Sequence, residues 1–252
     1  MEAVDKPGGA RYGMVIDLDT CGGCGACAVA CAVENNVPPA AERTTERNGI
    51  SWMRVQRLEA EGDARAAFIP VMCQHCGVKT PCVSVCPQNA VGVDPASGIV
   101  AQIPVRCLGC RYCMAACPYH ARSFNWWDPD WPGRIVETLN PEVSTRTRGV
   151  VEKCTFCSHR LQASQDAQAA KGADARAPEY TPACVEACPA GAIVFGDLDD
   201  PESEVARLAQ APGSFRLLER LGTGAKVYYH TTRDWVRRLA DGRAAGDGRT
   251  HG

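Results

Sequence analysis

Sixteen cysteines in four short groups of four constrain this 252-residue chain more than any other feature. Disulfide frameworks usually hold together small secreted domains that cannot build a core, whereas 45% of this chain is hydrophobic. The crowding therefore favours metal binding over disulfides. The groups are Cys21, Cys24, Cys27 and Cys31; Cys73, Cys76, Cys82 and Cys86; Cys107, Cys110, Cys113 and Cys117; and Cys154, Cys157, Cys184 and Cys188.

The spacing CxxCxxCxxxC occurs in the first and third groups. Bacterial-type ferredoxins bind 4Fe-4S clusters with this run, and in two-cluster ferredoxins the last cysteine, followed by proline, ligates the neighbouring cluster. Pro87, Pro118 and Pro189 take that place in three groups. Ala32 follows Cys31 instead, which predicts that a helix continues through the first group.

Zinc is an alternative metal, because paired CxxC motifs are typical of four-cysteine zinc sites and the second and fourth groups contain such pairs. Zinc does not explain why CxxCxxCxxxC occurs twice. The haem motif CxxCH is absent from the sequence. A Rieske centre needs two histidine ligands, but each group already has four cysteines, so we do not expect His75, His120 or His159 to bind iron.

A repeated pattern, CPxxA, follows the last cysteine of three groups as CPQNAV, CPYHAR and CPAGAI. It indicates one supersecondary unit used several times. Short helices are predicted at ACAVACAVEN, PCVSVC, CMAAC and ACVEAC, and hairpins over 50–72 and 91–105. Further predicted elements are a strand in YGMVIDLDTC, a helix over 160–171, a strand in AKVYYHTT and a last helix in RDWVRRL.

Charge and composition exclude several function classes. A net charge of -2 gives no basic surface for nucleic acid. No apolar run approaches the roughly 18 residues of a membrane helix, and the first twenty residues lack the apolar stretch of a signal peptide. No nucleophile and base constellation, dinucleotide fingerprint or phosphate loop is present. The chain is therefore predicted to be non-catalytic, with no membrane span of its own.

The order of the four groups, together with EKCTFCSHRL, TPACVEACPAGAI and FGDLDDPESEVARL, resembles the four-cluster iron-sulfur subunits of the complex iron-sulfur molybdoenzyme, or dimethyl sulfoxide reductase, family. The resemblance extends from about Tyr12 to Tyr229. This group includes electron-transfer subunits of polysulfide, thiosulfate and tetrathionate reductases, of sulfite dehydrogenases and of alternative complex III. The motifs are specific for the group rather than for one member.

The resemblance implies an α+β fold with two ferredoxin-like halves of two clusters each, carrying β-hairpin and helical insertions. It also implies that the first group pairs with the fourth and the second with the third, with last cysteines exchanged, so that four 4Fe-4S clusters are bound. The implied ligand sets are Cys21, Cys24, Cys27 and Cys188 (site 1); Cys73, Cys76, Cys82 and Cys117 (site 2); Cys107, Cys110, Cys113 and Cys86 (site 3); and Cys154, Cys157, Cys184 and Cys31 (site 4).

A division of the chain follows from the same resemblance. Residues 12–49 and 150–200 are expected to form the first half and residues 73–125 the second. The remaining expected segments are a hairpin insertion at 50–72, a connecting loop at 126–149, an insertion at 158–183, a C-terminal extension at 201–240 and a disordered tail at 241–252.

The implied function is the passage of single electrons between a molybdopterin-binding catalytic subunit and an integral-membrane, quinone-interacting subunit of a respiratory complex. The chain is then a peripheral membrane protein through its partners, on either side, exported only with a partner's signal. A soluble polyferredoxin shuttle is the alternative, and a structural zinc protein is a weaker one. Cations near the cysteines are candidates for tuning the reduction potential: Lys79, Arg106, Arg111, Lys153, His159 and Arg160.

Overall fold

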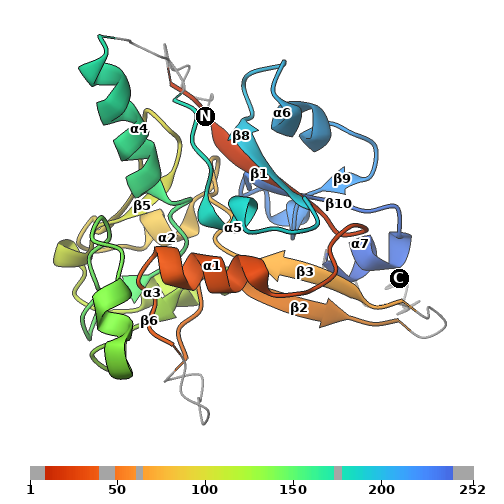
Figure 1. The fold of residues 1–252 in the computed structure, drawn as a ribbon. Coiled ribbons are helices and arrows are strands. Elements are labelled where there is room, and N and C mark those ends of the chain that lie inside the picture. The colour runs from red at the N-terminus through yellow and green to blue at the C-terminus, as the bar shows by residue number, and fades with distance from the viewer. Residues whose placement is uncertain (1–8, 40–48, 61–64, 173–177, 241–252) are drawn as a thin grey trace.

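The computed structural model describes residues 9–39, 49–60, 65–172 and 178–240. Its largest sheet has four strands in the order β8-β1-β10-β9. Strand β1 (Tyr12–Asp17) lies between β8 (Ile193–Asp197), to which it is antiparallel, and β10 (Val227–His230), to which it is parallel; β9 (Ser214–Phe215) closes the edge. The sheet therefore joins one strand from the beginning of the chain to three strands near its end (Figure 1).

Helix α6 (Glu204–Ala209) covers one face of this sheet, where Val15 and Leu198 pack against its Val205. Ser203 caps the helix by accepting a hydrogen bond from the Ala206 N–H at 3.2 Å. Helix α7 (Asp234–Ala240) ends the described chain. The predicted strand in AKVYYHTT and the predicted helix in RDWVRRL are confirmed as β10 and α7.

Three two-stranded ladders accompany the sheet in the described part of the chain. The predicted hairpin over 50–72 is β2 (Arg54–Leu58) paired with β3 (Ala67–Val71), and it projects from the body in Figure 1. The second hairpin is β4 (Val91–Val93) and β5 (Val100–Gln102); its second strand is shorter than predicted because Pro104–Arg106 form a 3-10 turn. Strands β6 (Ser123–Phe124) and β7 (Val151–Glu152) form the third.

Four short helices carry cysteines, as predicted. They are α1 (Ala26–Glu34), α2 (Pro81–Ser84), α3 (Tyr112–Ala115) and α5 (Ala183–Glu186). Helix α1 packs against α5, and α2 against α3, so helices of the first and fourth groups meet and those of the second and third groups meet. The predicted helix over 160–171 is α4 (Ser158–Ala170), which stands away from the body in Figure 1.

A buried ion pair fastens the segment before β7 to the end of α1. The Arg146 guanidinium pairs with Glu152, and the side chains are only 6% and 3% exposed. Its Nη2 donates to the carbonyl oxygens of Asn35 at 2.5 Å and Asn36 at 3.0 Å. The guanidinium also lies 4.9 Å from the ring centre of Trp52. Two further 3-10 turns among the described residues are Gly133–Thr138 and Glu219–Leu221.

The fold class is the expected one, a mixture of helices and strands built around two pairs of cysteine-bearing helices. The division into halves and insertions remains a proposal. The segment 201–240, expected as an extension, supplies the inner strand β10 and so belongs to the main sheet. The tail 241–252 lies outside the described residues.

Candidate metal centres

All sixteen cysteines lie in the described part of the chain, and none of them forms a disulfide. Three hollows of similar size, about 310, 330 and 360 Å³, are each lined by four of them. The structure brings together the cysteines of site 3 in the first hollow, of site 2 in the second and of site 1 in the third. In each case the fourth sulfur comes from the other group of the pair.

The cysteines of site 4 are brought together in the interior. Cys31, Cys154, Cys157 and Cys184 are all buried. Burial raises the pKa of the Cys31 thiol well above its usual range, and repulsion from Cys154, Cys184 and Cys157 raises it further. The Asn35 amide joins two of these sulfurs, since its Nδ2 lies 3.7 Å from Cys31 Sγ and 3.9 Å from Cys157 Sγ.

The CPxxA pattern has a physical reason in the turn that follows each cysteine. The alanine four residues on donates its backbone N–H to the cysteine sulfur, at 3.2 Å for Ala90 and Cys86 and at 3.3 Å for Ala192 and Cys188. The Ala121 N–H acts on Cys117 in the same way and opposes the rise in its pKa that burial causes. Proline fixes the chain direction at the start of this turn.

The first group obtains the same contact without a proline. Cys31 lies within α1, as the absence of proline predicts. The donor four residues on is the side-chain amide of Asn35, so a side chain replaces the backbone N–H used at the other three sites. Sequence reasoning missed Asn35; the signal was a polar residue at the position where three repeats have alanine.

Left-handed backbone residues shape the loops between cysteines. Gly109 has a φ of +74°, and a Cβ there would lie 2.5 Å from the Gly149 carbonyl oxygen, so only glycine fits between Cys107 and Cys110. His75 and Phe156 hold the matching positions of the second and fourth groups with φ of 45° and 54°. Their rings stack with centres 3.7 Å apart, which places sites 2 and 4 side by side.

The four sites form a row. Cys27 of site 1 is close enough to Cys184 of site 4 to raise its pKa by charge repulsion, and Cys73 of site 2 acts in the same way on Cys154 of site 4. Cys82 of site 2 acts likewise on Cys113 of site 3. The spatial order is therefore site 1, site 4, site 2 and site 3.

Exposure differs along this row. The only exposed cysteine, Cys24, belongs to site 1, and three of the four cysteines of site 3 are half-buried. Sites 2 and 4 are enclosed except for the half-buried Cys117. Apolar side chains are exposed on α1, which carries Cys27 of site 1 and Cys31 of site 4, and around site 3: they are Val29 and Val33 on α1, and Val105, Leu108 and Tyr112 around site 3.

The donor sets fit iron-sulfur clusters. Burial raises the pKa of Cys27 to about 11 and that of Cys76 and Cys154 to about 12, so these thiols retain their protons unless a cation replaces them. A second sign is Arg122, which lines site 2 and is 6% exposed. Its Nη2 atom is buried with no hydrogen-bond partner in the described chain, as expected for a donor that faces an anionic group.

The cations predicted near the cysteines have varied surroundings. Lys79, Arg106 and Arg111 are exposed, whereas Lys153 is 1% exposed and donates to the carbonyl oxygens of Val100 and Cys154. His159 and Arg160 both contact Glu34 at the end of α1. Sequence reasoning missed Arg122, although it stands where the sister repeats have buried Val91 and Ile193.

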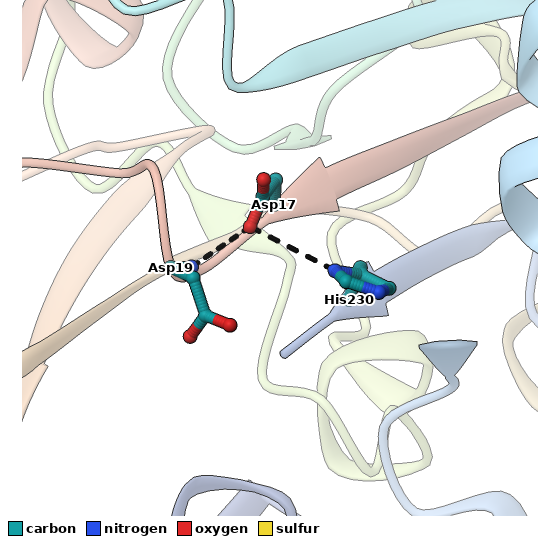
Figure 2. Close-up of side chains that lie close together, drawn as sticks. All are labelled: Asp17, Asp19 and His230. Atoms are coloured by element: carbon teal, nitrogen blue, oxygen red, sulfur yellow. Dashed lines mark hydrogen bonds and ion pairs between the residues drawn. The ribbon is translucent and has the colours of Figure 1, made fainter. Parts of the chain in front are cut away.

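A cluster of acidic and imidazole groups precedes Cys21. Ligand atoms of Asp17, Asp19 and His230 lie within 4.8 Å of one another. Figure 2 shows the Asp19 carboxylate turned away from the other two, with its backbone N–H bonded to Asp17 at 2.8 Å. That carboxylate accepts hydrogen bonds from the Thr231 hydroxyl, the Thr232 backbone N–H and the Arg233 guanidinium. The two aspartates therefore stabilise the turn that connects β1 to the first cysteine group.

Comparisons with known proteins agree with this geometry. Residues 64–131 and residues 106–192 each match a family model described as a 4Fe-4S dicluster domain. The chain is 51% identical, over 92% of both chains, to the iron-sulfur cluster-binding subunit of menaquinone reductase from Nitratidesulfovibrio vulgaris.

Two further relatives belong to other reductases. The putative dimethyl sulfoxide reductase iron-sulfur subunit of Halobacterium salinarum is 40% identical over 87% of this chain and 78% of the relative. A tetrathionate reductase subunit of Salmonella typhimurium is 37% identical over 87% of this chain and 72% of the relative. None of the helices in the described ranges combines the length and apolar character that a bilayer crossing requires.

The family and the cofactor expected from the sequence are thus confirmed. Two dicluster domains and sixteen cysteines account for four 4Fe-4S clusters. The chain belongs to the 4Fe-4S dicluster iron-sulfur subunits related to those of dimethyl sulfoxide, tetrathionate and menaquinone reductases, and it is a non-catalytic electron-transfer subunit of such a reductase complex.

Proposed function

We propose that sites 1 to 4 each bind one 4Fe-4S cluster through the four cysteines that meet there, and that single electrons cross the chain in the order site 1, site 4, site 2, site 3 or its reverse. The observation that carries this proposal is the convergence of four sulfurs, three from one group and one from its pair, on each of the three hollows of sites 1 to 3, together with the closeness of the four buried cysteines of site 4. Bound 4Fe-4S clusters would supply one-electron chemistry, at reduction potentials that the surrounding residues set.

The chain's residues hold and separate these centres. Stacked His75 and Phe156 fill the space between sites 2 and 4, the step at which the route passes from one pair of groups to the other. Burial and the nearby cations Lys153, Lys226 and Arg122 hold the pKa of His75 well below its usual range, so the ring is neutral. Its Nδ1 accepts from the Val100 N–H at 3.1 Å, which fixes the orientation of the ring.

Both ends of the row are suited to contact partner subunits. A molybdopterin-binding catalytic subunit on one side and an integral-membrane, quinone-interacting subunit on the other would account for the exposed apolar side chains on α1 and around site 3. The relative named as a menaquinone reductase subunit favours menaquinone as the quinone. The chain is then membrane-associated only through its partners. Self-contained shuttling is disfavoured, because that role requires no permanent apolar contact.

The test is purification of the tagged chain from its native host without oxygen. We expect co-purification of a large chain with a pterin cofactor and of a membrane chain, and about sixteen irons per polypeptide of this chain. Iron far below that value, or zinc in its place, contradicts the cluster assignment. A full complement of iron in a chain that elutes as a monomer supports the shuttle instead.

A matched pair of variants tests the end surfaces. Leu108→Asp places a charge beside site 3 on a residue that is 57% exposed, and we expect it to release one partner without loss of iron. Val78→Asp changes a residue that is 76% exposed but lies between the ends, beside Gly224, and serves as the control. Retention of both partners by the Leu108 variant contradicts the role of this surface.

A further inference from the structure

The guanidinium of Arg122 stands between sites 2 and 3. It lines the hollow of site 2 and faces Cys82 and Cys73 of that site, and it also faces Cys113 of site 3. One cation thus acts on sulfurs of two neighbouring centres.

This cation has no carboxylate counter-ion within the described residues. Arg146 is buried to the same degree but pairs with Glu152. A buried charge without a partner is strongly unfavourable. The sister repeats avoid the cost by placing Val91 and Ile193 at this position, where both are buried. Arg122 therefore requires an anion that the side chains around it do not supply.

Gln102 extends the arrangement into site 3. The Arg122 Nη1 atom donates to Gln102 Oε1 at 2.9 Å. That bond fixes which way the amide points, so its Nε2 is directed away from the guanidinium. Gln102 lines the hollow of site 3, and its Nε2 is buried and has no partner in the described chain. The two orphaned donors, Arg122 Nη2 and Gln102 Nε2, thus belong to residues that line two different hollows.

We propose that Arg122 and Gln102 form a positively charged bridge between sites 2 and 3 that raises the reduction potentials of both centres. The inference rests on the cluster assignment proposed above. Reduction adds negative charge to a centre, and a nearby cation and N–H donors stabilise that charge. The bridge keeps these two centres easier to reduce than their sulfur ligands alone would make them, and it couples their potentials.

Arg122→Gln is the first test, in the complete complex, with iron analysis followed by an anaerobic redox titration monitored by electron paramagnetic resonance. We expect two of the four one-electron steps to move to lower potential and the other two to stay in place. The sulfurs that act most strongly on Arg122 are Cys82, Cys73 and Cys113, all of sites 2 and 3, which is why the steps of sites 1 and 4 should not move. Arg122→Lys retains the charge and should restore most of the shift.

Gln102→Glu is the second test, and it leaves the guanidinium in place. A carboxylate at 2.9 Å from Arg122 neutralises the bridge, so the same two steps should move down. This variant decides the matter if Arg122→Gln does not assemble. Arg111→Gln is the control, because Arg111 also lines site 3 but is exposed and stacked on Trp126, and solvent screens its charge.

The outcomes separate the two proposals. Low iron in the unmodified complex contradicts the cluster assignment itself. Full iron with all four steps unmoved in both Arg122→Gln and Gln102→Glu overturns the bridge and leaves the assignment standing. Equal movement of all four steps, or a shift in Arg111→Gln as large as in Arg122→Gln, also overturns it, because the effect would then be one of overall charge.

Discussion

Arg146→Met tests the buried ion pair that fastens the end of α1. The change leaves the Glu152 carboxylate without its cation, and one oxygen of that carboxylate, Oε1, already has no partner among the described residues. Breaking one partner of a buried pair costs about 3–5 kcal/mol. The carbonyl oxygens of Asn35 and Asn36 lose their donor too, at about 1–3 kcal/mol each.

These costs overlap, since the same side chain makes all the contacts, and we expect a total of about 5 kcal/mol. A loss of that size is comparable to the lower end of the stability of a whole domain, about 5–15 kcal/mol. If half of it appears in the unfolding barrier, the unfolding rate rises roughly 70-fold.

The assay follows the absorbance of the clusters in the blue region of the spectrum, which falls after the anaerobic complex is transferred to a moderate concentration of guanidinium chloride. Because cluster loss makes unfolding irreversible, the rate is the proper measure of stability. Arg134→Met is the matched control: Arg134 is 88% exposed and pairs with Glu137 only at the surface, so the rate should change by less than about threefold.

A second substitution checks the reasoning. In the Arg146→Met background, Glu152→Gln removes the unpaired carboxylate and should recover part of the lost lifetime, because an uncharged amide is less costly to bury. A single variant that bleaches as slowly as the unmodified chain, or a double variant that bleaches faster than the single one, would refute the argument.

Three further changes have defined outcomes. Asn35→Ala removes the amide from two sulfurs of site 4 and should lower the potential of that centre alone in a redox titration. Gly109→Ala brings a Cβ to 2.5 Å from the Gly149 oxygen and should cost about a quarter of the iron, whereas Gly133→Ala, with open space around it, should keep all of it. Glu34 has its pKa lowered from 4.5 to about 2, mainly by its hydrogen bonds from Arg160. The stability that ionised Glu34 contributes is complete above about pH 4.5 and is lost as the pH falls towards 2. Glu34→Gln should therefore lower the stability at pH 7 by about 1–2 kcal/mol, seen as faster bleaching, and the difference from the unmodified chain should shrink below pH 4.5.

Local sequence patterns were sufficient for most of the elements. Two strand-like runs separated by turn residues predicted the β2–β3 hairpin. The alanine-rich run predicted α4, which begins at Ser158, two residues before the predicted start. The missing proline after Cys31 predicted a helix that continues, as α1 does. These features depend on neighbouring residues alone, so they can be inferred from the printed chain.

The main sheet could not be inferred in this way. Nothing in the sequence of β10 states that it lies parallel to β1, more than two hundred residues earlier, and it was expected only as part of an extension. The grouping of cysteines from distant motifs came from a family resemblance rather than from spacing. Arg122 and Asn35 were missed because their importance depends on which sulfurs they face, although each stands out against its sister repeats.

The way in which the cysteines of different motifs combine determines the order in which the sites can be completed during translation. All eight cysteines of sites 2 and 3 lie within residues 73–117, whereas sites 1 and 4 combine residues 21–31 with residues 154–188. A nascent chain can therefore complete sites 2 and 3 before the ribosome has made the later cysteines that sites 1 and 4 require. Metal loading should proceed from the middle of the polypeptide outward, and a chain stopped before Cys184 would carry half its iron and an unfinished first motif.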